Sequence, residues 1–265
     1  MTLIQLIVLA LIQGLTEFLP VSSSAHLILG SNAFGWPDQG LVYDTATHLG
    51  TLFAVLVYFR HELLDMGKSW LRPVVNDEDR QNRSLGLYLL IASIPVLLIG
   101  ALASGFVEQH LRDVRIVAWS TLVFGLLLWF AHAIGPRVKT IVDLNMKSAL
   151  IIGVAQVLAL IPGASRSGIT ITAARMLGYT PDAAARFSFL LSIPVISAVG
   201  LYSILRIASG DTQIDWMQFG IGVVFAALAG WVCIAAFLEL LKRIGLMPFV
   251  IYRLLLGVFL LWFLL

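Results

Sequence analysis

Long runs of apolar residues constrain this chain more than any other feature of its sequence. They occupy residues 43–59, 84–103, 115–134, 183–206, 217–241 and 248–265. A helix of ~20 apolar residues matches the hydrocarbon thickness of a bilayer. Inside that layer only helices and closed barrels satisfy their own backbone hydrogen bonds. The sequence therefore predicts an all-α, polytopic integral membrane protein with six transmembrane helices.

The composition supports this class and excludes others. Hydrophobic residues make up 59% of the 265 residues and charged residues only 12%, whereas a soluble domain carries about a quarter charged residues. The net charge is +2, and without a Lys/Arg-rich run nucleic acid is excluded as a partner. The single cysteine, Cys233, lies in an apolar run, which excludes a disulfide framework and a cysteine metal site.

Two further apolar segments are short and each is interrupted by a proline. Residues 2–18 precede Pro20, and a second short helix is predicted to start at the following serines and to run to about Ser31. Residues 146–161 precede Pro162 in the same way, and hydroxyl residues follow again. A broken helix is tolerated at membrane depth only where protein or a wet cavity surrounds it. We therefore expect two re-entrant helical hairpins.

The order of these segments repeats along the chain. Pro20 and Pro162 are 142 residues apart, and the same shift moves the first span into the fourth. Each half holds one hairpin and three crossings, an odd number, so the second half enters the membrane from the opposite face. This pattern predicts one membrane domain over 1–265, built as an inverted repeat of 1–135 and 140–265.

The basic residues indicate how the chain is oriented. In this layout only Arg112, Arg115 and Arg206 fall on one side. The opposite side carries Arg60, Lys68, Arg72, Arg80, Arg83, Arg137, Lys139, Lys147, Arg175, Arg186, Lys242 and Arg243. The positive-inside rule makes that second side cytoplasmic and both termini external. The charged stretch 60–83 is interpreted as a solvated loop.

A cluster of polar residues follows the first apolar segment. Gln13 and Glu17 are four residues apart and share a helical face, as do Ser22 and His26. Arg166 and Thr170 repeat this spacing in the second hairpin. Ionisable side chains are costly inside a bilayer and by default indicate a functional site. We expect these faces to converge on one pocket.

The same residues indicate chemistry on an anion. Half-helix N-termini bind anions, and the guanidinium of Arg166 suits phosphate oxygens. In an apolar surround this favours a lipid with a phosphorylated head. Ser23 is the preferred nucleophile and Ser22 the reserve, with His26 as general base or acid. In the rival scheme Glu17 or His26 activates water directly. The other four histidines have no such polar cluster beside them in the sequence and are interpreted as structural or interfacial: His48, His61, His110 and His132.

Two motifs resemble those of the undecaprenyl-diphosphatase family, also called the bacitracin-resistance protein family. The first is Gln/Glu-x-x-x-Glu running into Phe-Leu-Pro-Val-Ser-Ser, here from Gln13 to Ser23 with His26. The second is Pro-Gly-x-Ser-Arg-Ser-x-x-Thr, here from Pro162 to Thr170. The segment Lys-Arg-Ile-Gly-Leu-Met-Pro-Phe-Val-Ile-Tyr-Arg near the C-terminus fits as well.

The resemblance implies a bacterial inner-membrane enzyme that hydrolyses undecaprenyl diphosphate to undecaprenyl phosphate and inorganic phosphate. That reaction recycles the lipid carrier of peptidoglycan synthesis, and sequestration of the substrate by bacitracin accounts for the resistance. The resemblance also implies a site that opens toward the periplasm and a homodimer as one possible assembly. Catalysis is then assigned to Glu17, Ser22, Ser23, His26 and Arg166, and substrate binding to Gly163, Ser165, Arg166, Ser167 and Thr170.

A divalent cation, Mg²⁺ or Ca²⁺, is expected as cofactor. Glu17 and Gln13 offer it hard oxygen ligands one helical turn apart, and the phosphates and water would complete the shell.

Two other functions are compatible with parts of the pattern. A carrier or flippase for a phosphorylated lipid or small anion is the alternative, because secondary transporters also use inverted repeats with broken helices. A transporter needs donors around its anion but no nucleophile with a neighbouring base, which the serines, His26 and Glu17 together provide. A non-catalytic membrane scaffold leaves the intramembrane Arg166 and Glu17 unexplained.

Overall fold

The computed structural model describes residues 1–27, 35–36, 39–111, 113–210 and 214–264, and in these ranges the chain folds into helices. The first half contains α1 (Leu3–Phe18), a short helix over residues 23–27, α3 (Gly40–Tyr58), α4 (Arg60–Leu71), α5 (Asp77–His110) and α6 (Val114–Ile134). The second half contains η1 (Ile141–Asp143), α7 (Met146–Ala155), η2 (Gln156–Leu160), α8 (Arg166–Met176), α9 (Pro181–Ala208), α10 (Trp216–Ile244) and α11 (Met247–Leu264). The predicted all-α fold is confirmed.

Five of these helices, α3, α5, α6, α9 and α10, are long and apolar enough to cross a membrane. Helix α1, the α7–η2 segment and the Met247–Trp262 part of α11 are apolar but shorter. The chain is therefore a multi-pass membrane protein. The predicted end of the first hairpin near Ser31 and the position of Arg112 lie outside the described residues.

The interpretation of residues 60–83 as a loop holds only for the exposed connector 72–76 and is wrong for the residues on either side of it. Residues 60–71 form α4, whose Met66 and Ser69 are buried, and α5 begins at Asp77. The Asn76 side chain caps α5 by accepting a hydrogen bond from the Asp79 N–H at 2.7 Å. Acidic residues in a first turn stabilise a helix through its dipole. The acidic residues Asp77, Glu78 and Asp79, which were interpreted as part of a solvated connector, thus form the first turn of α5.

Close packing fixes the helices around the site. A Cβ at Gly50 of α3 would lie 2.4 Å from the Val223 carbonyl of α10, and one at Gly14 of α1 would lie 2.7 Å from the Ala226 carbonyl. Backbones approach this closely only where small residues face each other, as is common in membrane helices. Helices α1 and α3 are therefore held in place along α10.

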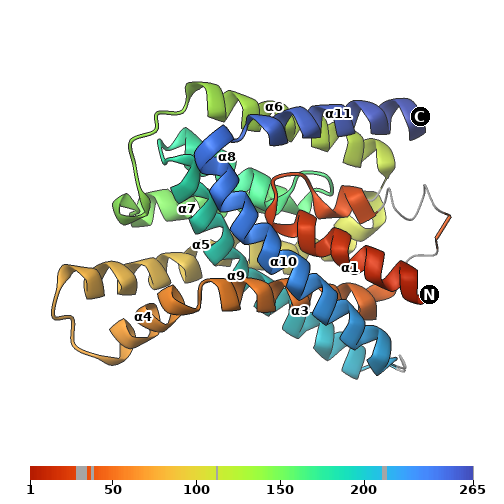
Figure 1. Cartoon of the computed structure of the whole chain (residues 1–265), viewed down its shortest axis with the longest axis horizontal. Helices are drawn as coiled ribbons and strands as arrows, with labels where there is room; N and C mark the ends of the chain where they lie inside the picture. Colours follow the sequence, from red (N-terminus) through yellow and green to blue (C-terminus); the bar gives the residue numbers. More distant parts are fainter. Residues whose placement is uncertain (28–34, 37–38, 112, 211–213, 265) are drawn as a thin grey trace.

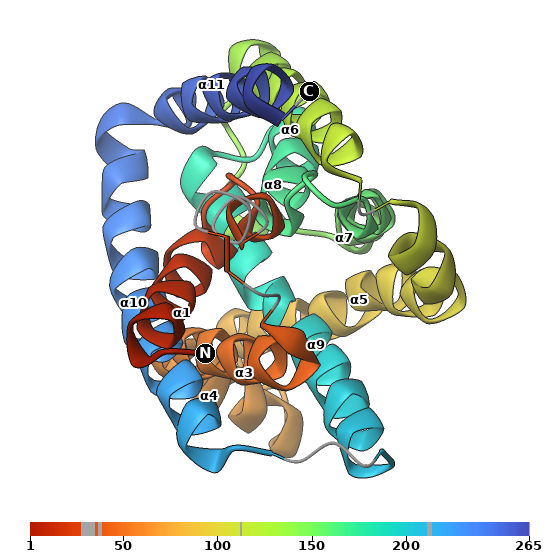
Figure 2. The same cartoon turned by 90° about the vertical axis from the view of Figure 1, so that its right-hand side faces the viewer.

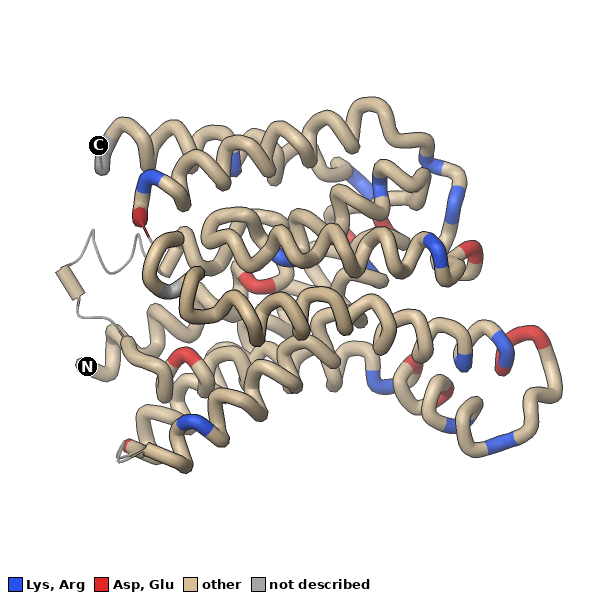
Figure 3. The backbone as a smooth tube through the Cα atoms, turned by 180° about the vertical axis from the view of Figure 1, so that it is seen from behind, with Lys and Arg blue, Asp and Glu red and all other residues tan. Residues whose placement is uncertain are grey.

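The views show how the helices are arranged. Both chain ends lie at the same end of the molecule, and α6 and α11 run side by side (Figure 1). Seen from the side, α8 and the chain just after α1 lie in the interior, inside the longer helices (Figure 2). Most lysines and arginines gather at the end of the molecule opposite the chain ends (Figure 3).

Candidate active site

The first helix break turns the chain back into the protein. Helix α1 stops where Leu19 becomes extended, one residue before Pro20. Ser22 then takes a positive φ of 72°, a conformation that favours glycine. Its hydroxyl accepts a hydrogen bond from the Ala25 N–H at 3.4 Å. A strained serine and a proline thus start the helix over residues 23–27.

The second break has the same construction. Gly163 has a φ of +91°, and a Cβ there would lie 2.1 Å from the Ser120 hydroxyl oxygen and 2.4 Å from the Val117 carbonyl oxygen. Ser165 has a positive φ of 69° and caps α8 by accepting a hydrogen bond from the Gly168 N–H at 3.1 Å. This break therefore admits no side chain at residue 163.

The two breaks contact each other directly. The Gly163 N–H donates to the Ser24 hydroxyl at 3.3 Å, and the Ser167 hydroxyl donates to the Leu19 carbonyl at 2.8 Å. The prediction that the two broken segments meet is confirmed. Their meeting places the ends of α1 and α8 against one another.

Arg253 of α11 holds both breaks from behind. It is fully buried, and its guanidinium donates to the carbonyls of Pro20 at 3.3 Å, Thr121 at 3.3 Å and Gly163 at 2.9 Å. These carbonyls come from both breaks and from α6. The sequence analysis missed Arg253, although it ends the C-terminal segment that carries part of the family resemblance.

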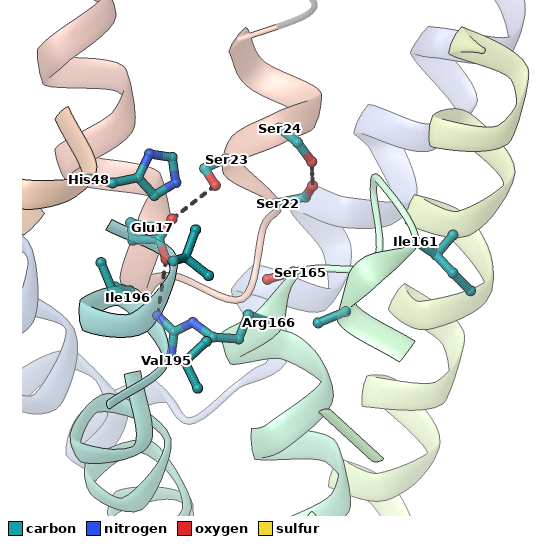
Figure 4. Close-up of a pocket in the computed structure, with 12 residues that line it drawn as sticks. Glu17, Ser22, Ser23, Ser24, His48, Ile161, Ser165, Arg166, Val195 and Ile196 are labelled. Atoms are coloured by element: carbon teal, nitrogen blue, oxygen red, sulfur yellow. Dashed lines mark hydrogen bonds and ion pairs between the residues drawn. The ribbon is translucent and has the colours of Figure 1, made fainter. Parts of the chain in front are cut away.

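A charged centre lies where the breaks meet. The guanidinium of Arg166 donates to Glu17 Oε1 at 3.1 Å, and the two side chains are 12% and 9% exposed. The other oxygen, Glu17 Oε2, accepts from Gln13 at 2.9 Å and from the Ser23 hydroxyl at 3.1 Å. Figure 4 shows Ser23 and Arg166 approaching the Glu17 carboxylate from different segments. A hydroxyl next to a carboxylate and a fixed cation is an arrangement suited to phosphoryl chemistry.

These side chains line a cavity of about 240 Å³. One part is polar and holds Glu17, Ser22, Ser23, Ser24, His48, Ser165 and Arg166. The rest is apolar and holds Ala159, Ile161, Val195, Ile196 and Val199. Val199 is 49% exposed. The apolar wall therefore extends from the charged centre to a solvent-accessible side chain of α9, a helix long and apolar enough to cross a membrane.

The two histidines near the site differ from expectation. His26 does not line the cavity; its Nδ1 donates to the Ser22 carbonyl at 2.7 Å, and its Nε2 accepts from the Tyr252 hydroxyl at 2.5 Å. His48 does line it. The interpretation that His48 has no polar residues near it is therefore wrong, because the fold brings α3 to the cavity from a distant part of the sequence.

The remaining predicted binding residues have protein partners. Thr170 is fully buried and its hydroxyl bonds to the Ser188 hydroxyl at 2.7 Å. Ser167 is also fully buried. Gly163 provides the positive φ that the second break requires. Ser165 lines the cavity. Of these residues, Ser165 is therefore within reach of a substrate in the cavity, whereas Gly163, Ser167 and Thr170 do not line it.

Gln13 and Glu17 fit the predicted divalent cation in their donor chemistry. Gln13 is fully buried, and its Oε1 has no hydrogen-bond donor within the described structure. An orphaned amide oxygen one turn from a carboxylate is the kind of hard ligand that Mg²⁺ and Ca²⁺ prefer. Among the described residues no group of three His, Cys, Asp or Glu side chains gathers, so phosphate oxygens and water would supply most ligands.

Fold and site together define a multi-pass membrane protein with an internal cavity in which serine hydroxyls, a carboxylate and an arginine meet. The family model "Bacitracin resistance protein BacA" matches residues 6–259, and the chain belongs to that family.

Curated relatives match over their whole length. The chain is 52% identical to "Undecaprenyl-diphosphatase 1" of Pseudoalteromonas translucida, with 100% of this chain and 99% of the relative covered. It is 51% identical to "Undecaprenyl-diphosphatase" of Teredinibacter turnerae, with 98% of each chain covered. It is also 51% identical to "Undecaprenyl-diphosphatase" of Colwellia psychrerythraea, with 100% of each chain covered.

Proposed function

We propose that this chain hydrolyses undecaprenyl diphosphate to undecaprenyl phosphate and inorganic phosphate, which recycles the lipid carrier of peptidoglycan synthesis and confers bacitracin resistance. The single observation that carries the proposal is the Ser23 hydroxyl bonded to Glu17, which in turn pairs with Arg166 inside a cavity with an apolar wall. The family membership and the names of the full-length relatives support the same reaction.

The chemistry follows from the contacts. The terminal phosphate binds at Arg166, Ser165 and the free N–H groups where α8 and the helix over 23–27 begin. The Ser23 hydroxyl attacks the terminal phosphorus and passes its proton to Glu17, to which it is already bonded at 3.1 Å. Undecaprenyl phosphate leaves with the electron pair of the broken P–O bond, and water then releases the phosphate from Ser23.

Ser23 is favoured over Ser22 as nucleophile by their partners. Ser22 is 1% exposed and its hydroxyl lies 3.1 Å from the Ser24 hydroxyl, whereas the Ser23 hydroxyl contacts the carboxylate that accepts its proton. When bound, a divalent cation held by Glu17 and Gln13 would neutralise phosphate charge. The Ser23–Glu17 pair also favours an enzyme over a carrier, since transport requires no such pair.

The apolar wall gives the prenyl chain its path. Val195, Ile196 and Val199 of α9 line the cavity, and Val199 is 49% exposed. A lipid tail that follows these residues leaves the protein sideways, while its diphosphate stays at Arg166. This arrangement admits a substrate that never leaves the bilayer.

The topology completes the proposal. The chain crosses a bacterial inner membrane six times. Helix α1 begins one re-entrant hairpin, and α7, η2 and α8 form the other, which is related to the first by an inverted repeat. The site opens toward the periplasm, the side on which both chain ends lie. Supporting this orientation, most basic residues gather at the end opposite the chain ends (Figure 3).

Phosphate release from purified protein tests the function. In detergent, where no second compartment exists, the chain should release one inorganic phosphate per C55 diphosphate, and Arg166→Ala should lose about 10²-fold or more of that rate. Arg186→Ala is a matched control, because Arg186 pairs with Glu62 away from the cavity. A purified, folded wild type that releases no phosphate contradicts the proposed function.

A further inference from the structure

His48 carries an imidazole into the candidate active site that the chemistry above does not use. It lies in α3 and lines the same cavity as Glu17, Ser23 and Arg166. Figure 4 shows its ring beside Ser23 and Glu17, on the side of the carboxylate away from Arg166. No sequence motif marks this residue, because α3 otherwise reads as an ordinary apolar span.

The hydrogen bonds of His48 leave one nitrogen open toward the cavity. Its Nδ1 lies 2.8 Å from the Asp44 backbone carbonyl. A carbonyl oxygen only accepts, so Nδ1 carries the proton and Nε2 of the neutral ring keeps its lone pair. Within the described structure Nε2 has no hydrogen-bond partner.

His26 is in the opposite situation. Its Nδ1 donates to the Ser22 carbonyl, and its Nε2 lone pair already accepts the Tyr252 hydroxyl. Its ring stacks on Tyr252 at 5.6 Å between centroids. Both ring nitrogens of His26 thus have hydrogen-bond partners, and His26 does not line the cavity. His48 does line it, and its Nε2 lone pair is available as a base.

We propose that His48 is the general base that activates water in the second half of the reaction. This inference rests on the proposed function. In the first half Glu17 takes the Ser23 proton, and in the second half it returns that proton to the Ser23 oxygen, so a different group has to take the proton of the attacking water. The second half therefore needs a separate base within the cavity, and Nε2 of His48 is available for it.

The step balances as follows. Water forms a bond to phosphorus and gives its proton to His48 Nε2, while the bond between phosphorus and the Ser23 oxygen breaks. The Ser23 oxygen takes that electron pair and recovers its proton from Glu17. Inorganic phosphate leaves, and His48 later releases its proton to water.

The fold holds His48 in position for this step. A Cβ at Gly50, two residues further along α3, would lie 2.4 Å from the Val223 carbonyl of α10. Near the start of α3, the Tyr43 hydroxyl donates to the Leu6 carbonyl of α1. The helix that carries His48 is thus fixed to the helix that carries Glu17.

His48→Asn tests the proposal against a merely structural role. Asparagine keeps a side-chain N–H near the position of Nδ1, so it keeps a donor for the Asp44 carbonyl, but it has no base in place of Nε2. The probe is a prenyl diphosphate labelled in its terminal phosphate. We expect His48→Asn to release one prenyl phosphate per enzyme in a rapid burst, to retain the label on Ser23, and to release inorganic phosphate about 10²-fold or more slowly than wild type.

Controls separate the possible failures. His61→Asn changes an exposed histidine at the start of α4 and should match wild type, and His48→Asn/Ser23→Ala should retain no label. Wild-type turnover by a folded His48→Asn variant overturns the proposal, and so does slow turnover without retained label. A wild type that releases no phosphate contradicts the proposed function instead, so the two failures are distinguishable.

Discussion

Ser22 and Ser23 are neighbours in the chain, yet the fold gives their hydroxyls different surroundings. Ser23 contacts Glu17, while Ser22 is buried and helps to start the helix over 23–27. The sequence predicted the acid, the serines and Arg166, because polar residues in an apolar chain stand out. It did not predict His48, Tyr252 or Arg253, because only the fold brings α3 and α11 to the breaks.

The first prediction at this scale separates the two serines. Ser23→Ala should turn over at less than about a thousandth of the wild-type rate, because it lacks the nucleophile. Ser22→Gly, which tolerates the φ of 72°, should stay within about tenfold of wild type, because Ser22 only shapes the break. Steady-state phosphate release measures both. Similar residual activity in the two variants would reject covalent catalysis by Ser23.

The second prediction concerns the cation. EDTA should abolish phosphate release, and added Mg²⁺ or Ca²⁺ should restore it. In the absence of substrate, calorimetry should show only weak cation binding, since Gln13 and Glu17 supply few of the ligands that such ions need. Gln13→Leu should raise the cation concentration that gives half-maximal activity. Full activity after chelation would show that Glu17 acts without a metal.

At the scale of elements, the site depends on where two helices stop. Both breaks were predictable from proline and serine in short apolar segments. Their meeting was also predicted, but the particular contacts between residues were not, because they join residues more than a hundred positions apart, such as Gly163 and Ser24. The start of α5 was missed, because its capping residues were interpreted as a charged loop.

The third prediction tests the second break. Gly163→Ala should lower the free energy of unfolding by about 2–4 kcal/mol, because alanine is strained at a φ of +91° and its Cβ would overlap Ser120 and the Val117 carbonyl. Gly105→Ala is a matched control, since a Cβ at that position in α5 meets nothing within 4 Å. Thermal unfolding in detergent compares them. Equal stability of the two variants would mean that residue 163 is not confined as described.

At the scale of the whole molecule, the apolar runs predicted a multi-pass helical protein, and the structure confirms it. The inverted repeat and the orientation stay predictions, because they depend on the bilayer and on the sorting of basic residues. Asp211, which the sequence places on the external side, lies outside the described residues.

The fourth prediction therefore uses Ser209 at the end of α9 and Asp77 at the start of α5. In a chain with Cys233 replaced by alanine, Ser209→Cys should react with an impermeant thiol reagent from outside the cell. Asp77→Cys should react only after the membrane is opened. Labelling of both positions in intact cells would contradict the proposed topology.

The most direct measurement is the structure of the protein with a prenyl diphosphate analogue whose bridging oxygen is replaced by a methylene group. The account predicts that the terminal phosphorus lies in contact with the Ser23 hydroxyl and Arg166, with the prenyl chain along Val195 and Val199 of α9. The basic cavity lined by Arg137 and Lys242 would then stay free of the analogue. A diphosphate bound in that basic cavity, or one that leaves Ser23 out of reach of phosphorus, would contradict the assignment of the active site.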